Sequence, residues 1–462
     1  MSQTISMPLW AFVLILLFAV VTFASHFLFP SVRWFFRKRA ERVIARLNTR
    51  LQRPIEPFKL ARRYDMIQRI IYDPEITKAI VDYAATENVP ENVAFEKARD
   101  YAREIVPSFS ATAYFTIGTR LAKWLSTSLY RIRLGTFDRE GLSKLDPDAT
   151  VIFVMNHRSN MDYVLVTYLA ARAGALSYAV GEWARVWPLS SVIRAMGAYF
   201  IRRKSRGDLY RKVLARYVQM ATAGGVSQAV FPEGRLSVTG ALADPKLGLL
   251  NYIVSDFKPG NRDVIFVPVA LNYDRVLEDR FLVQADKTGE RRFRPPLWMM
   301  VRVVVQHMWQ RITRRFKKFG TAAVSFGAPL NLAGFVAQGS GDMTDEVAAE
   351  LMRRISDVIP VLSVPLVSWI LTTEGAMARG ELVTRVEAVT ADLVARGIPA
   401  PRREAQVVVE AALTDLIARG ALAESADVIM ENPDDRDLLA YYARSIAHHF
   451  DAGAAENAAI AE

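Results

Sequence analysis

The chain has 462 residues and a formal net charge of +11, with a sequence pI near 9.7. This length predicts more than one domain. It contains no cysteine, which excludes disulfides, thiolate metal sites and a cysteine nucleophile. The basic balance favours anionic partners, which are nucleic acids, anionic lipid headgroups or phosphorylated substrates.

The first segment, residues 7–30, is apolar, and no charged side chain precedes Arg33. It is long enough to cross a hydrocarbon core of about 30 Å. Five cations follow it directly: Arg33, Arg37, Lys38, Arg39 and Arg42. We therefore expect a retained, single-pass transmembrane anchor with the rest of the chain on the cytoplasmic side. A cleaved signal peptide is the alternative, but residues 1–6 lack the basic residues that such a peptide carries.

Residues 31–128 follow as a juxtamembrane and helical region. Its basic first part, residues 31–65, is expected to lie on an anionic membrane surface. Prolines then punctuate a helical stretch up to residue 128. They are Pro74, Pro90 and Pro107.

Residues 129–335 alternate strand-like and helical runs, which predicts an α/β domain with a mostly parallel sheet. The expected strands are residues 130–134, 150–155, 226–231, 264–271 and 322–326. The expected helices are residues 160–172, 188–196 and 207–223. Pro268 lies inside one apolar strand, which predicts an edge strand or a bulge.

The pattern is helical from residue 343 to residue 450, which predicts a C-terminal helical domain beside the α/β domain. Its expected helices are residues 344–358, 364–374, 379–396 and 402–419. The last residues, 451–462, are polar and alanine-rich, and we expect a flexible tail.

The most informative motif is Asn156-His157-Arg158-Ser159-Asn160-Met161-Asp162. On one continuous helix His157 and Asp162 would lie roughly 140° apart. They can meet if His157 lies in the turn before a helix and Asp162 in its first turn. A neutral histidine held by a carboxylate is a general base for a hydroxyl. The alternative is an ordinary helix start in which Asp162 only favours the helix dipole.

Two further motifs point to an anion site at strand ends. Gly197-Ala198-Tyr199-Phe200-Ile201 is followed by Arg202, Arg203 and Lys204, which either face solvent or bind an anion such as a phosphate. Phe231-Pro232-Glu233-Gly234-Arg235 follows a buried strand, and Lys246 comes shortly after. Ligands of open α/β sheets bind at the carboxyl ends of strands, although an ordinary strand-to-loop turn would read the same way.

These motifs occur in one order, and together they resemble the glycerol-3-phosphate acyltransferase branch of the glycerolipid acyltransferase superfamily. Other resembling stretches are Pro245-Lys246-Leu247-Gly248, Val267-Pro268-Val269 and, more weakly, residues 324–329 and 441–450. The resemblance implies direct acyl transfer from acyl-CoA or acyl-carrier protein to the hydroxyl of glycerol 3-phosphate. It implies no cofactor beyond this co-substrate. Acylation of lysophosphatidate is the alternative within the family.

The resemblance also implies roles for single residues. His157 is the expected general base, and Asp162 orients it. Arg202, Arg203 and Lys204 are expected to bind the acceptor's phosphate, with Lys246 assisting, while Glu233 and Gly234 shape the acceptor site. Arg235 joins the substrate-binding residues, although it stands earlier than the family's arginine: three residues after the glutamate this chain has Leu236.

Other classes of function are less well supported. No zinc-ligand spacing, RNA-binding aromatic motif or glycine-rich phosphate loop indicates a metal site or nucleic-acid binding. Residues 297–319 combine apolar and basic halves, which fits either a helix on an anionic membrane or a helix that covers the sheet. The alternative from a different class is a catalytically inactive membrane scaffold that binds lipid.

Overall fold

The computed structural model describes residues 8–137, 145–170, 174–181, 185–187, 189–202, 207–289, 318–337 and 343–450. The chain divides into two compact units, residues 1–55 with 172–174 and residues 56–171 with 175–462. The first unit consists mainly of helix α1 (Leu9–Asn48). Among the described residues, no helix has both the length and the apolar character that a membrane crossing requires. The predicted anchor at residues 7–30 stays a prediction.

The second unit begins with short helices that the prolines delimit. These are α2 (Pro57–Leu60), α3 (Arg63–Ile71), α4 (Pro74–Glu87), α5 (Glu91–Ile105), a π-helical turn (Ala113–Gly118) and α6 (Thr119–Leu129). Pro74 opens α4 because a proline costs nothing at the first helical position, and the Asp73 side chain caps it by accepting from the Glu75 N–H at 3.1 Å.

The described residues form an eight-stranded sheet in the order β1-β7-β6-β2-β5-β3-β4, with β8 paired to β6. The strands are β1 (Arg131–Phe137), β2 (Thr150–Met155), β3 (Ser177–Gly181), β4 (Tyr199–Ile201), β5 (Gln228–Val230), β6 (Val264–Tyr273), β7 (Thr321–Phe326) and β8 (Leu330–Asn331). The central pairings β6·β2, β2·β5, β5·β3 and β3·β4 are parallel, whereas β7 and β8 run antiparallel to β6. The predicted mostly parallel α/β domain is confirmed.

The strand that contains Pro268 is central, so the prediction of an edge strand is wrong. β6 pairs with β2 along one side, and all ten of its residues are buried. On its other side β7 pairs from Val269 onward and β8 pairs at Ile265 and Phe266. Pro268 lies where the neighbouring chain passes from β7 to β8, so its missing N–H falls in a gap of the ladder.

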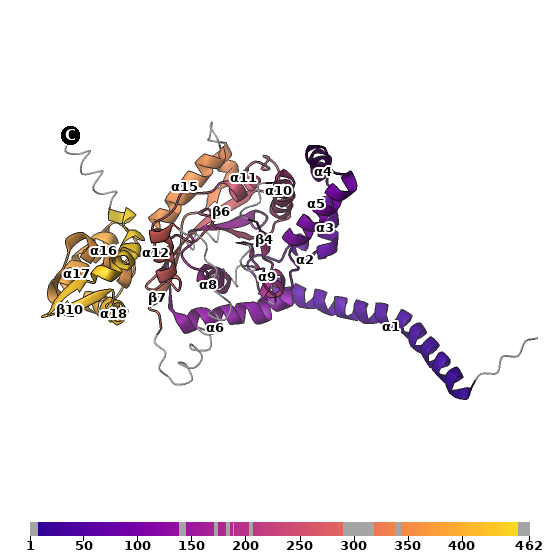
Figure 1. Cartoon of the computed structure of the whole chain (residues 1–462), viewed down its shortest axis with the longest axis horizontal. Coiled ribbons are helices and arrows are strands. Elements are labelled where there is room, and N and C mark those ends of the chain that lie inside the picture. Colours follow the sequence, from indigo (N-terminus) through magenta and orange to yellow (C-terminus); the bar gives the residue numbers. More distant parts are fainter. Residues whose placement is uncertain are drawn as a thin grey trace, which may run out of the picture. The chain divides into compact units, whose positions relative to one another are not determined.

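Helices cover both faces of this sheet (Figure 1). On one face α8 (Met161–Ala170) packs against Val151 and Phe153, and on the other α10 (Asp208–Ala223) and α15 (Met343–Asp357) pack against Ile152 and Val154. Because neighbouring residues of a strand point to opposite faces, the uninterrupted apolar run of β2 supplies both cores. The remaining helices of this region are α9 (Leu189–Ala195), α11 (Gly248–Val254), α12 (Asp279–Thr288) and α14 (Leu332–Val336).

The C-terminal region contains strands as well as the predicted helices. Its elements are α16 (Ser363–Glu374), β9 (Met377–Ala378), α17 (Arg379–Ala395), α18 (Ala405–Ala418), β10 (Leu422–Ser425), β11 (Val428–Glu431) and α19 (Arg436–Arg444). The strands form an antiparallel sheet in the order β10-β11-β9. Helix, strand, two helices and a two-stranded hairpin in this sheet order have the topology of a winged-helix module, here residues 363–431.

Candidate active site

The turn at residues 156–160, between β2 and α8, brings His157 and Asp162 together. The Nδ1 of His157 lies 2.9 Å from the Oδ2 of Asp162. Because Asp162 lies in the first turn of α8, its carboxylate also faces the backbone of the preceding turn. Oδ2 accepts hydrogen bonds from the backbone N–H groups of Arg158 at 2.7 Å and Ser159 at 3.0 Å.

The second carboxylate oxygen of Asp162 is bound from β6. The hydroxyl of Tyr273 donates to Oδ1 at 2.6 Å. Burial and the nearby charge of Asp162 hold the pKa of Tyr273 well above its usual value, so the tyrosine remains a hydrogen-bond donor. Asp162 is fully buried and accepts from four donors, so its orientation toward His157 is fixed.

The imidazole ring of His157 is held on its faces and at one nitrogen. Its centroid lies 4.1 Å from that of the Phe231 ring and 5.4 Å from that of the Tyr163 ring. Since the Nδ1–H donates to Asp162, the lone pair lies on Nε2. Nε2 has no hydrogen-bond partner within the described part of the chain, so this nitrogen can accept a proton from a ligand.

Glu233 holds the backbone of this turn. Its Oε1 accepts from the His157 N–H at 2.8 Å and its Oε2 from the Ala243 N–H at 3.1 Å. The N–H of Ser237 donates to the His157 carbonyl oxygen at 3.0 Å. Burial raises the pKa of Glu233 to about 7, although both N–H donors act in the opposite direction. Glu233 therefore contributes to the site by fixing His157.

Gly234 and Lys246 lie together, and Arg235 lies beside them in the chain. Gly234 has φ of +67°, and a Cβ at this position would lie 3.1 Å from the Cδ of Lys246. The Lys246 N–H donates to the Pro232 carbonyl oxygen at 2.8 Å, which places the lysine over the turn. Arg235 is half-buried, and no hydrogen bond or ion pair joins its guanidinium to another described residue. Its guanidinium is therefore available to an anion.

Arg202, at the end of β4, is already paired. Its Nε and Nη2 bind both carboxylate oxygens of Glu104 on α5, with the shortest contact at 2.6 Å. Arg185 donates to the same carboxylate at 2.7 Å. The hydrogen bond to Glu104 raises the pKa of Arg202 above its usual value. Arg203 and Lys204, predicted beside Arg202, lie outside the described residues.

The sheet order separates these two groups of cations. β5, which leads to Glu233 and Arg235, is the direct neighbour of β2, whereas β4 lies three strands from β2. With a strand spacing of about 4.8 Å, the end of β4 is roughly 14 Å from the end of β2. The structure thus groups Glu233, Gly234, Arg235 and Lys246 near His157 and places Arg202 farther along the same sheet edge.

Comparisons with known proteins identify two family regions in the chain. An acyltransferase family model matches residues 137–272, and a model of the glycerol-3-phosphate acyltransferase C-terminal region matches residues 308–461. A glycerol-3-phosphate acyltransferase of Shewanella amazonensis is 29% identical over 370 residues, and that of Shewanella halifaxensis is 28% identical over 354. The chain thus contains an acyltransferase domain and a region similar to the C-terminal region of glycerol-3-phosphate acyltransferases. The alignments cover 74% and 71% of this chain but only 44% and 42% of those relatives.

A solved structure of the 1-acyl-sn-glycerophosphate acyltransferase of Thermotoga maritima is also similar. The match covers 61% of this acyltransferase-family chain and 91% of the other, with 19% identity and a TM-score of 0.32. Within the described residues, no group of three or more histidine, aspartate or glutamate side chains has the arrangement of a metal site.

Several residues of this acyltransferase-like site could not be found from the sequence. Tyr273 and Glu104 contact Asp162 and Arg202 from positions 111 and 98 residues away, and only the tertiary fold sets such contacts. Glu278 accepts from the hydroxyl of Ser159 at 2.7 Å. The only sequence feature of Glu278 is that it is a carboxylate shortly after a buried strand, and this feature is too common to identify a site.

Proposed function

We propose that this protein is an O-acyltransferase that transfers a fatty acyl chain from acyl-CoA or acyl-carrier protein to a hydroxyl of glycerol 3-phosphate. The product is a lysophosphatidic acid. One observation carries the proposal: a buried histidine is bound at Nδ1 by a fixed carboxylate and has its Nε2 without a partner in the described structure. The family of the chain supplies the reaction class.

The proposed reaction needs only proton transfer and direct displacement. Nε2 of His157 accepts the hydroxyl proton while the oxygen attacks the thioester carbonyl carbon, and the carbonyl oxygen becomes an oxyanion. The tetrahedral intermediate then expels the thiolate, which receives the proton from the imidazolium. Asp162 stabilises the imidazolium in between. The absence of cysteine agrees with direct transfer, since no thioester with the enzyme can form.

We assign the acceptor's phosphate to Arg235 and Lys246 before Arg202. Arg235 follows the strand next to β2 and has a guanidinium without a partner among the described residues, while Arg202 binds Glu104. An arginine can bind two phosphate oxygens at once. The single-residue difference from the family pattern at Arg235 is thus compatible with a phosphate site close to His157.

Acylation of lysophosphatidate is the second candidate, because its acceptor end carries the same phosphate and one hydroxyl. We further propose that the protein works at a membrane with its catalytic body on the cytoplasmic side. The support is the uncharged apolar run at residues 7–30, followed by a cluster of arginines and lysines. The inactive lipid-binding scaffold is the alternative from another class.

The test is thiol release from palmitoyl-CoA by membranes that contain the protein, with glycerol 3-phosphate and lysophosphatidate offered separately. The same assay is repeated with palmitoyl-acyl-carrier protein. A His157→Ala variant should lose turnover, since a positioned base contributes roughly 10²–10⁴ in rate. Asp345→Asn, at an exposed position of α15, is the control.

Turnover with glycerol 3-phosphate supports the proposal, and turnover with lysophosphatidate alone moves it to the second candidate. Full activity of the folded His157→Ala variant would contradict the general-base mechanism. If the wild-type protein binds anionic vesicles but releases no thiol with either acceptor and either donor, the scaffold is the better description.

A further inference from the structure

The segment 273–279, called the connector below, leads from the end of β6 into α12. It lies between the two stretches that the family models match, residues 137–272 and 308–461. Its side chains and backbone bind in two directions. One set holds the turn that carries His157, and the other set holds the C-terminal region.

Toward the active site the connector supplies a hydroxyl and a carboxylate. Tyr273 donates to Asp162 at 2.6 Å. Glu278 accepts from the Ser159 hydroxyl at 2.7 Å and from the Asn160 side-chain amide at 3.0 Å. Because Glu278 and Asp162 are buried, no water can easily replace these bonds. A shift of the connector would therefore move the carboxylate that orients His157.

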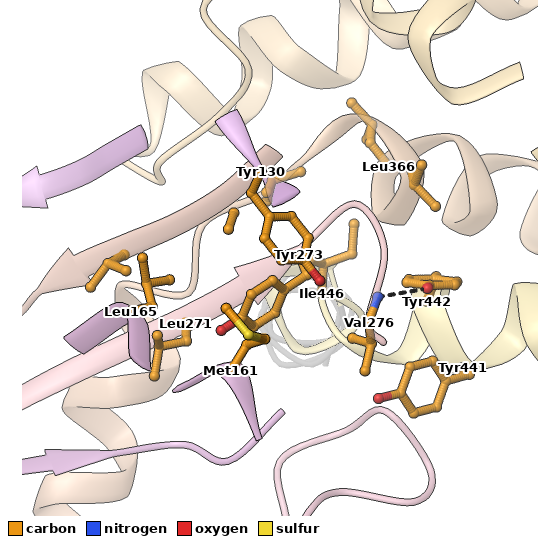
Figure 2. Close-up of a cluster of buried hydrophobic side chains, with 14 of the residues drawn as sticks. Tyr130, Met161, Leu165, Leu271, Tyr273, Val276, Leu366, Tyr441, Tyr442 and Ile446 are labelled. Atoms are coloured by element: carbon orange, nitrogen blue, oxygen red, sulfur yellow. Dashed lines mark hydrogen bonds between the residues drawn. The ribbon is translucent and has the colours of Figure 1, made fainter. Parts of the chain in front are cut away.

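Toward the C-terminal region the Asp274 carboxylate of the connector accepts from the Val364 N–H at 3.0 Å, and Arg275 pairs with Asp415 at 3.7 Å. Tyr442 on α19 binds the connector at two further points. The hydroxyl of Tyr442 accepts from the backbone N–H of Val276 at 3.0 Å, as Figure 2 shows, and donates to the carboxylate of Asp279. The buried guanidinium of Arg419 pairs with the same carboxylate. Burial holds the pKa of Tyr442 well above its usual value, so the hydroxyl keeps its proton.

The helix α19 also touches the second loop that holds His157. A Cβ on Gly240 would lie 1.9 Å from the backbone oxygen of Tyr441, so the two backbones are in direct contact. Arg444 donates to the carbonyl oxygen of Thr239 at 3.4 Å. The loop that contains Glu233 and Ser237, which bind the His157 backbone, therefore rests on α19.

The winged-helix topology of residues 363–431 could suggest nucleic-acid binding, but the charge of this module argues against it. The module carries ten carboxylates and six arginines, a formal charge of −4 in a chain of +11. The exposed side chains along α18, the helix that would enter a groove, include no cation between residues 406 and 414. A nucleic-acid-binding helix needs cations that contact phosphates. The charge of this module therefore does not favour nucleic-acid binding.

We infer that α19 is a positioning element of the active site: Tyr442 fixes the connector, and the connector fixes Asp162 and the turn that carries His157. This inference rests on the proposed function. It gives the C-terminal region a role in catalysis without contact to a substrate. Since Tyr442 positions the base and binds neither substrate, its loss should lower kcat and leave KM unchanged.

Two adjacent tyrosines allow a matched test. Tyr442→Phe removes the hydroxyl that binds Val276 and Asp279. Tyr441→Phe removes a hydroxyl that is equally buried but has no hydrogen-bond partner in the described structure. Both variants keep the aromatic ring, so packing in the helix is preserved, and a melting curve of each verifies that it is folded.

We expect kcat of Tyr442→Phe to fall about 10- to 100-fold, because a small displacement of a catalytic group has effects of this size. Tyr441→Phe should behave as the wild type. Selective ¹³C labelling of the histidines adds a readout that does not require turnover. The ring signals of His157, identified by their loss in His157→Ala, should move in Tyr442→Phe alone. Equal kcat and equal His157 signals in the two tyrosine variants would overturn the inference.

The labelling also separates the two proposals. A wild-type protein without activity toward either acceptor would refute the proposed function, while the His157 signals would still decide whether Tyr442 positions the histidine.

Glu278→Gln tests the connector from its other end. If the connector acts as one unit, Tyr442→Phe adds little to the loss that Glu278→Gln causes. Losses that multiply fully would show independent effects and contradict the inference.

Discussion

Two regions along the sheet's carboxyl edge, one after the central strand β2 and one at the outer strand β4, are built in opposite ways. After β2, the side chain of Asp162 and the backbone of His157 are buried and bound by directed hydrogen bonds. At β4, Arg202 follows the strand, and Arg185, which comes after β3, binds the same buried carboxylate of Glu104; both arginines are partly exposed. A group that transfers protons must keep one orientation, whereas cations that bind a mobile anion can exchange partners. We therefore regard the region after β2 as the rigid one and the region at β4 as the adaptable one.

The largest expected effect comes from a change in the rigid region after β2. Asp162→Asn replaces an acceptor-only carboxylate with an amide, which cannot bind the Nδ1–H of His157 and the two backbone N–H groups of the turn in the same way. We expect kcat to fall by roughly 10²–10⁴ with little change in KM. Thiol release under saturating substrate measures it, with Asp345→Asn as the control. A kcat near that of the wild type would show that Asp162 does not orient the base.

The next effect concerns the buried carboxyl of Glu233. Burial raises its pKa from 4.5 to about 7, so between these pH values the folded chain holds a proton that the unfolded chain has lost. The contribution of Glu233 to the free energy of unfolding is fully present below pH 4.5. It decreases by about 3 kcal/mol as the pH rises to 7. Glu233→Gln should remove this loss. Unfolding free energies at pH 4.5 and 7.5 measure the difference between variant and wild type.

The matched control for this effect is Glu346→Gln, an exposed carboxylate at the start of α15. Its difference from the wild type should hardly vary with pH. The prediction fails if the Glu233→Gln difference is equally independent of pH. In that case Glu233 would already be ionised in the folded protein at pH 4.5.

A smaller effect compares the two arginines as phosphate ligands. Arg235→Ala should raise KM for glycerol 3-phosphate about 10- to 100-fold, the equivalent of losing a hydrogen bond to a charged group. Arg202→Ala should raise it less, since Arg202 binds Glu104 and lies three strands from β2. Initial rates over a range of acceptor concentrations give KM for each variant and so compare the two arginines. A larger effect at Arg202 would move the phosphate site toward β4.

The smallest effect tests the contact between α19 and the Glu233 loop. Gly240 and Gly260 both have φ of +91°, but a Cβ meets the Tyr441 backbone oxygen at Gly240 and nothing within 4 Å at Gly260. Gly260→Ala should cost only the backbone strain, about 1–2 kcal/mol. Gly240→Ala should cost about 1–3 kcal/mol more because of the overlap. Equal melting temperatures of the two variants would mean that the contact between Gly240 and α19 can shift without a cost in stability.

Much of the fold could be predicted from the sequence, because long apolar periodic runs determine it. β2 matches its predicted range, and α15, α16 and α17 match theirs within one residue. Among the short strands β5 lies inside its predicted range of 226–231, whereas strands such as β4 and β9 were not predicted, because two or three residues carry too little periodicity to recognise. The prediction of an edge strand at Pro268 was wrong because the rule for prolines considers only the strand's own sequence. It does not include the interruption of the neighbouring strand beside Pro268.

The candidate site was only partly predictable, for a similar reason. His157 and Asp162 are five residues apart, so their contact follows from local turn geometry. Glu104 resembles the other carboxylates of α5, and nothing in its sequence neighbourhood indicates that Arg202 will reach it. The role of Glu233 as a support for the His157 backbone depends on the adjacency of β2 and β5.

The clamping of the His157 ring has a consequence for selectivity. With Nδ1 on Asp162 and one face against Phe231, the ring cannot turn without breaking a buried hydrogen bond. Its lone pair therefore points along one fixed line. Glycerol 3-phosphate carries a primary and a secondary hydroxyl of similar acidity, so a freely rotating base would discriminate poorly between them. In the proposed reaction, a base fixed in direction would make the choice by geometry, and regioselectivity would become a property of the turn after β2.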